Sequence, residues 1–236
     1  MPLLSSTPST FRTGPFGDGT HLYRPAPDVV LQQKYPFVLP PLGYETNALM
    51  PALNAATVEA HYRSVHASHV QALNTALTAH PTLHEYSLGQ LLMGLRRWPE
   101  AARGPIREHG SAHANHALYW KVLAPGAATA TAPNGRLGSM ITRDFETVDA
   151  CKAALREAAL GVEGNGWAWL VKTATNRLAV RTLPNDDSPL LDGELPVLGI
   201  DVWEHAYRRM YQTQRAAYVD AVLARINWDV VGAQVE

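Results

Sequence analysis

The chain has 236 residues, of which 46% are apolar, and its net charge is −1 at pH 7. This length and composition predict a folded protein of one large domain or two lobes. The near-neutral charge argues against nucleic acid or a membrane as a partner, and no apolar run approaches the roughly 18 residues needed to span a bilayer. The single cysteine, Cys151, excludes an internal disulfide and a thiolate metal site.

The first segment, residues 1–34, is rich in Ser, Thr, Pro and Gly and shows no helical or strand periodicity. We predict an irregular N-terminal extension. A mitochondrial presequence is the alternative, although Asp18, Asp28 and several prolines disfavour it. One free cysteine is typical of a reducing compartment, so we expect a cytoplasmic location, with the mitochondrial matrix as the alternative.

Residues 35–125 are predicted to form a helical lobe. Apolar residues and histidines recur at spacings of three and four over 55–77, where Asn54 is a suitable N-cap. Further helices are expected over 87–97 and 112–123. Pro and Gly residues within 124–135 then predict a link to a second lobe.

Residues 135–236 are predicted to form a mixed lobe. A helix is expected over 147–160, ended by Gly161 at the C′ position. Val, Trp, Leu and Thr then predict three strands, the first two joined as a hairpin, over 166–173, 178–183 and 195–200. A final helix is expected over 203–226.

The densest group of metal-binding residue types is Asp201-Val-Trp-Glu-His205. A strand places Asp201 at its C-terminal end, and His205 follows four residues later in the first turn of a helix, so both side chains can converge on one point. His61 lies on an apolar helix face, where a histidine is more often a hydrogen-bonded core residue. His113 and His116 are three apart on one helix and could suggest zinc, but zinc favours cysteine or a short histidine-rich loop.

Several motifs occur together in one order along the chain. They are Leu39-Pro-Pro-Leu-Gly-Tyr44, His61, Asn115-His116-Ala-Leu-Tyr-Trp120, Gly164-Asn-Gly-Trp-Ala-Trp-Leu170 and Asp201-Val-Trp-Glu-His-Ala-Tyr207. In these motifs the chain resembles the iron/manganese superoxide dismutases from about residue 35 to the C-terminus. The resemblance implies an α+β fold: a helical hairpin lobe, then an α/β lobe with a three-stranded antiparallel sheet.

The resemblance also implies a function and a site. The expected activity is dismutation of superoxide to oxygen and hydrogen peroxide at one manganese or iron ion per subunit, held by His61, His116, Asp201 and His205. Other residues expected around the ion or at its entrance are His69, Asp186, Trp167, Trp169, Trp203, Tyr207 and Arg215. A homodimer, or a tetramer built from dimers, is also implied, with Glu204 reaching the partner subunit's His205.

Four positions depart from the pattern of the family. His69 and Arg208 stand where most members have tyrosine, and Val65 stands where most have histidine. The glutamine expected to bond the metal-bound solvent is replaced at both of its usual positions, by Asp186 and Ala112. The choice between manganese and iron therefore stays open at this point, as does an alternative function, a relative that binds metal without dismutating superoxide.

Overall fold

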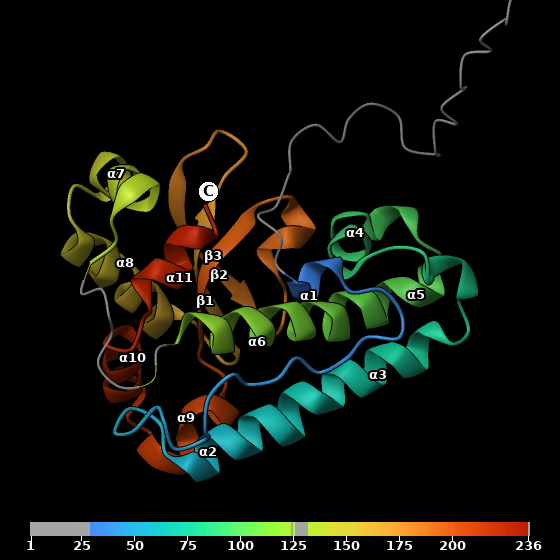
Figure 1. The fold of residues 1–236 in the computed structure, drawn as a ribbon, viewed down its shortest axis with the longest axis horizontal. Coiled ribbons are helices and arrows are strands. Elements are labelled where there is room, and N and C mark those ends of the chain that lie inside the picture. The colour runs from blue at the N-terminus through green and yellow to red at the C-terminus, as the bar shows by residue number, and fades with distance from the viewer. Residues whose placement is uncertain (1–28, 124, 126–131, 236) are drawn as a thin grey trace, which may run out of the picture.

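The structure is a computed structural model that describes residues 29–123, 125 and 132–235. A helical N-terminal region is followed by a mixed C-terminal lobe built on a small sheet (Figure 1). The helical segments of the first region are α1 (Val29–Gln32), α2 (Ala55–Glu59), η1 (Ala60–His66), α3 (Ala67–Leu77), η2 (Pro81–Leu83), α4 (Leu88–Met93), η3 (Leu95–Arg97), α5 (Glu100–Pro105), η4 (Ile106–Gly110) and α6 (Ser111–Val122).

The first long helix consists of α2, η1 and α3 and runs without a break over 55–77, as predicted. The side chain of Asn54 accepts a hydrogen bond from the Thr57 backbone at 2.9 Å and caps its start. The middle segment, η1, is π-helical. In a π-helix the backbone bonds join residues five apart, which changes the residues that share a face.

The second long helix, from α5 through η4 to α6, begins at Glu100 and not at residue 112 as predicted. Gly104, Pro105 and Gly110 are residues that disfavour a helix interior, so the sequence predicts no helix over this stretch. Pro105 has no N–H to donate, but the π-helical segment η4 follows it directly and the helix continues. The prediction over 87–97 was also too long, because α4 ends at Met93 and a short 3₁₀ segment follows.

The predicted extension over 1–34 is wrong at its C-terminal end. Val29–Gln32 form the short helix α1, and Val30 and Leu31 are buried. Residues 1–28 lie outside the described part of the chain, as does most of the predicted link over 124–135.

The C-terminal lobe contains two helices before its sheet. They are α7 (Gly135–Phe145), which the sequence reading missed, and α8 (Val148–Gly161), whose start Thr147 caps. Gly161 was predicted at the C′ position, after the end of this helix, but it is the last residue of α8, and the extended Val162 is the C-cap. After the sheet come α9 (Glu204–Tyr211), α10 (Arg215–Leu223) and α11 (Trp228–Ala233). The prediction of one helix over 203–226 was wrong, because Gln212 adopts a positive φ of 54° and separates α9 from α10.

The sheet confirms the three predicted strands. Strands β1 (Gly166–Lys172), β2 (Leu178–Pro184) and β3 (Leu195–Asp201) are antiparallel in the order β2-β1-β3. The central strand β1 is almost wholly buried, with α8 packed on β1 and β2 and α6 packed on β3. The register pairs Trp167 with Asp201 and therefore places the end of β3 beside a buried indole. No helix in the described part of the chain is long and apolar enough to cross a membrane.

Candidate metal centre

Four side chains from both parts of the fold meet at one point. His61 comes from η1, His116 from α6, Asp201 from the end of β3 and His205 from the first turn of α9. One donor atom from each lies within 4.8 Å of the others. The Oδ2 atom of Asp201 is 3.1 Å from His61 Nε2, 3.6 Å from His116 Nε2 and 3.0 Å from His205 Nε2. Three of these residues are buried, and His205 is partly exposed.

Neighbouring groups orient these donors. His116 Nδ1 donates to the Ala112 carbonyl at 2.7 Å, which leaves its Nε2 lone pair directed at the cluster. Asp201 accepts the Trp203 N–H on Oδ1 at 2.9 Å, and its carbonyl accepts the Tyr218 hydroxyl at 2.7 Å. The other carboxylate oxygen of Asp201 therefore faces the three imidazoles.

The charges fit a metal site. Burial lowers the pKa of His61 and of His116 and favours their neutral, ligating forms. Burial opposes ionisation of Asp201, but His205 and His61 beside it hold the pKa of that carboxyl well below its usual range. Among the described residues, the buried Nε2 atoms of His61 and His116 find no hydrogen-bond partner. Three imidazoles and a carboxylate suit a first-row metal ion, which would satisfy both nitrogens.

Indole rings pack against the cluster and against one another. Trp167 packs edge-on against His116 at 5.2 Å between ring centroids, Trp169 stacks on Trp167 at 5.2 Å, and Trp203 stacks on His205 at 5.5 Å. Trp167 and Trp169 are fully buried and leave little room for bulk water.

Asp186 is also brought to the centre. It is 5% exposed, and its Oδ1 accepts the Trp167 indole N–H at 3.2 Å. The Asn115 side chain donates to its backbone carbonyl at 2.9 Å. Burial, together with the negative charge of Asp201, raises the pKa of Asp186 to about 7. Near neutral pH this carboxyl therefore exists both with and without its proton.

His69 lies beside His116, close to two further histidines, His66 and His109, that were not predicted from the sequence to belong to the site. Its ring stacks on His116 at a centroid distance of 6.0 Å, and its Nδ1 lies 3.1 Å from Nδ1 of His109. His66 is fully buried and stacks on His116 at 5.4 Å, while its Nε2 bonds His113 Nδ1 at 2.9 Å. His66 lies five residues after His61, and that spacing aligns side chains in the π-helical segment η1.

The remaining predicted residues lie at the edge of the centre. Glu204 forms an ion pair with Arg208 one turn along α9, and both side chains are exposed. Arg215 donates to the carbonyls of Val162 at 2.6 Å and Gly164 at 2.9 Å and lies over the Tyr207 ring. Tyr207 stacks on Tyr218, whose hydroxyl donates to the Asp201 carbonyl.

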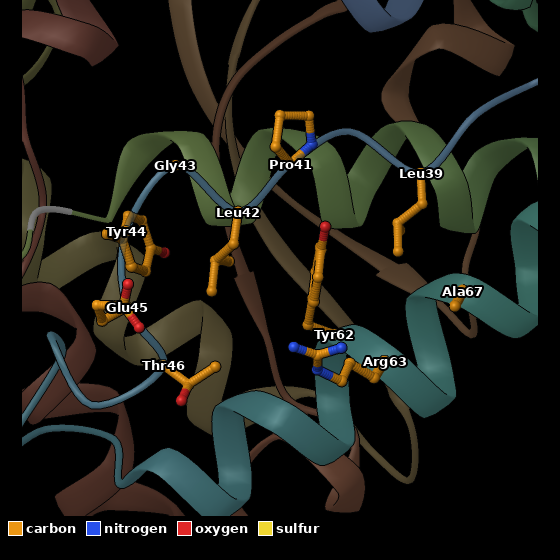
Figure 2. A pocket seen from close by; sticks show the side chains of 10 residues that line it. All are labelled: Leu39, Pro41, Leu42, Gly43, Tyr44, Glu45, Thr46, Tyr62, Arg63 and Ala67. Carbon is orange, nitrogen blue, oxygen red and sulfur yellow. The ribbon is translucent and has the colours of Figure 1, made fainter.

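Two surface pockets lie near the first long helix. One, of about 370 Å³, reaches the centre, because His205 is among its lining residues, which are Thr57, Ala60, Glu204, His205, Arg208 and Arg209. Figure 2 shows the other, between segment 39–46 and Tyr62, Arg63 and Ala67 of the helix. Tyr62 points at this segment and donates to the Pro40 carbonyl at 2.6 Å. The four clustered residues are not among the described residues that line this second pocket.

The fold and the site define a mononuclear metal-binding protein whose centre lies between a helical region and a mixed lobe. The family model for the iron/manganese superoxide dismutases, alpha-hairpin domain, matches residues 36–124, and the model for their C-terminal domain matches residues 133–234. The chain therefore belongs to the iron/manganese superoxide dismutase family.

Individual relatives cover most of the chain. It is 43% identical over 196 residues to a manganese superoxide dismutase of Thermus thermophilus, a match that spans 83% of this chain and 95% of the relative. It is 41% identical to a manganese superoxide dismutase of Bordetella pertussis, over 85% of this chain and 94% of the relative. It is also 41% identical to a manganese/iron superoxide dismutase of Methylomonas, over 85% of this chain and 98% of the relative.

Proposed function

We infer that this chain is a superoxide dismutase of the manganese/iron type, and we propose His61, His116, Asp201 and His205 as its metal ligands. The observation that carries the proposal is the convergence of these four donor atoms within 4.8 Å in a largely buried centre. We propose 35–125 and 135–236 as the bounds of the two metal-binding lobes. The family models, which match nearly the same residues, support these bounds.

When bound, a manganese or iron ion supplies the one-electron chemistry that oxidises one superoxide to oxygen and reduces the next to hydrogen peroxide. Three neutral imidazoles and one carboxylate neutralise only part of the charge of such an ion, and a positive centre attracts a small anion. The buried Trp167 and the partly buried Trp203 restrict access for bulk water and pack against two of the ligand rings.

We propose that Asp186 acts on the centre as a hydrogen-bonding neighbour that holds a proton near neutral pH. With its proton, Asp186 can donate a hydrogen bond as the glutamine of other family members does; without it, Asp186 can only accept. The Trp167 and Asn115 bonds support this role because they fix the carboxyl beside the ligands. Replacement by Gln, a donor at every pH, is expected to change the reduction potential of the bound metal and to flatten its dependence on pH.

We propose that His69 lies on the approach of the anion. Burial and the neighbouring His109 lower the pKa of His69 to about 4, so the ring is neutral at physiological pH. A neutral imidazole can donate or accept a hydrogen bond without adding charge to the path. Arg215 is proposed as the cation at the entrance, where its bonds to two backbone carbonyls hold the guanidinium.

We propose a homodimer, or a tetramer built from dimers, in which Glu204 bonds the partner subunit's His205. The exposed Glu204 and the partly exposed His205 line one pocket, which supports such a contact. Light scattering tests it: a monomer at micromolar concentration contradicts the role of Glu204. A cytoplasmic location is also proposed, supported by the buried, unpaired Cys151.

Metal content tests the ligand assignment. His205→Ala is expected to lose stoichiometric manganese and iron, because it removes one of the four donors. His80→Ala, a histidine in the turn after α3, is the matched control and is expected to keep full metal content. Circular dichroism on both variants confirms folding. Full metal content in folded His205→Ala contradicts the assignment.

A further inference from the structure

A short loop, residues 185–188 between β2 and η5, carries Asp186, and each of its first three residues is attached to another part of the fold. Trp203 donates its indole N–H to the Asn185 carbonyl at 3.1 Å. Asp186 is held by Asn115 and Trp167, as described above. Its other neighbour, Asp187, is held from the helical region by an ion pair that none of the proposed roles explains.

That ion pair joins Arg107 of η4 to Asp187. Arg107 Nε donates to Asp187 Oδ1 at 2.7 Å and Nη2 donates to Oδ2 at 2.6 Å, so the pair is bidentate. The Asp187 side chain is only 17% exposed, whereas that of Arg107 is 59% exposed. A bidentate guanidinium fixes the plane of a carboxylate as well as its position.

Both attachments from the helical region come from one helix, which also carries the ligand His116. Arg107 and Asn115 are separated by eight residues (115 − 107), or about 12 Å at 1.5 Å per residue. The two attachments hold consecutive residues of the loop, through the backbone carbonyl of Asp186 and the side chain of Asp187, so this part of the loop is tied twice to the same helix. The pair that holds Asp187 therefore adds a further restraint on the position of Asp186 relative to His116, beside the direct bonds from Asn115 and Trp167.

We propose that Arg107 is a positioning residue, which acts through Asp187 to hold the Asp186 carboxyl at the metal centre. The inference rests on the proposed role of Asp186. An ordinary exposed ion pair contributes little to stability and does not position a third side chain. A positioning role and an ordinary ion pair therefore predict different effects on the reduction potential of the bound metal when the pair is broken.

The experiment uses Arg107→Met and Asp187→Asn, both of which break the pair. They change the net charge in opposite directions, by removing a positive and a negative group respectively. A mere electrostatic effect on the metal would shift its reduction potential in opposite directions in the two variants. A displaced Asp186 shifts it in one direction, the same as in Asp186→Ala, which removes the carboxyl from the centre. Arg156→Met is the matched control, because it breaks another bidentate pair, with Asp220, between α8 and α10.

Two readouts are measured on the full-length protein. Hydrogen exchange of the metal-free protein is expected to be faster over 184–188 in Arg107→Met and unchanged there in Arg156→Met. The potential of the manganese-loaded protein is expected to shift in the same direction in Arg107→Met and Asp187→Asn, with Arg156→Met equal to wild type. Opposite shifts, or faster exchange with an unchanged potential, overturn the inference. If Asp186→Ala itself leaves the potential unchanged, the proposed role of Asp186 fails instead, and the positioning role fails with it.

Discussion

The substitution Gly199→Ala probes the packing behind the metal centre. Gly199 lies opposite Trp169 in the β1–β3 register, and a Cβ placed there would be 2.4 Å from one ring carbon of Trp169 and 2.8 Å from two others. Optimal carbon contacts are about 3.5–4.0 Å, so the ring or the strand has to move by about 1 Å or more. Trp169 is fully buried and stacked on Trp167, which leaves it no free direction.

Overpacking of this kind costs about 1–3 kcal/mol, which for a chain of this size lowers Tm by roughly 2–12 °C. Differential scanning calorimetry of manganese-loaded protein at a fixed metal concentration measures the shift. Gly232→Ala is the matched control: it lies in helix α11 with open space around the new methyl, and its Tm is expected to be equal or higher. A Gly199→Ala variant that melts with the wild type contradicts the packing argument.

Three further predictions use the same protein. Tyr218→Phe leaves the buried Asp201 carbonyl without its donor, and an unfolding free energy lower by about 1–3 kcal/mol is expected in urea titrations. Asp144→Asn removes a carboxylate whose pKa is lowered by its bond to Arg143. The stability that this bond contributes is present above the pKa of the unfolded state and is lost as the pH falls through the lower pKa of the folded state. The Tm of the variant is therefore expected to lie below that of the wild type at neutral pH, and the difference is expected to close in acid. Chelation of the metal is expected to lower Tm, in a way that added manganese reverses, because the ion stabilises only the folded state. A Tm gap that widens in acid, or a Tm unaffected by chelation, contradicts the corresponding reasoning.

The sheet and the four clustered residues could be predicted from sequence for physical reasons. Strand patterns in β1–β3 reflect burial directly, and Asp201 and His205 lie in one strand-to-helix segment whose geometry is local. His61 and His116 are distant in sequence, and only the resemblance to the family joined them to that segment before the structure placed all four together.

The helical boundaries were predicted less well because helices tolerate local disruption. Pro105 favours a break, yet the chain continues through a π-helical segment that no simple spacing rule anticipates. A similar segment around His61 brings His66 onto His116, whereas regular α-helical spacing would have aligned Val65 with His61. The ion pair of Arg107 with Asp187 joins residues 80 apart, and pattern alone gives no signal for it.

Stopped-flow measurement of superoxide decay tests the central claim most directly. The protein is loaded separately with manganese and with iron, its metal content is measured, and each form is compared with His205→Ala. Rapid catalytic decay with at least one metal, lost in His205→Ala, is the predicted result. Stoichiometric metal in both forms with no decay above the uncatalysed rate would contradict dismutation at this centre.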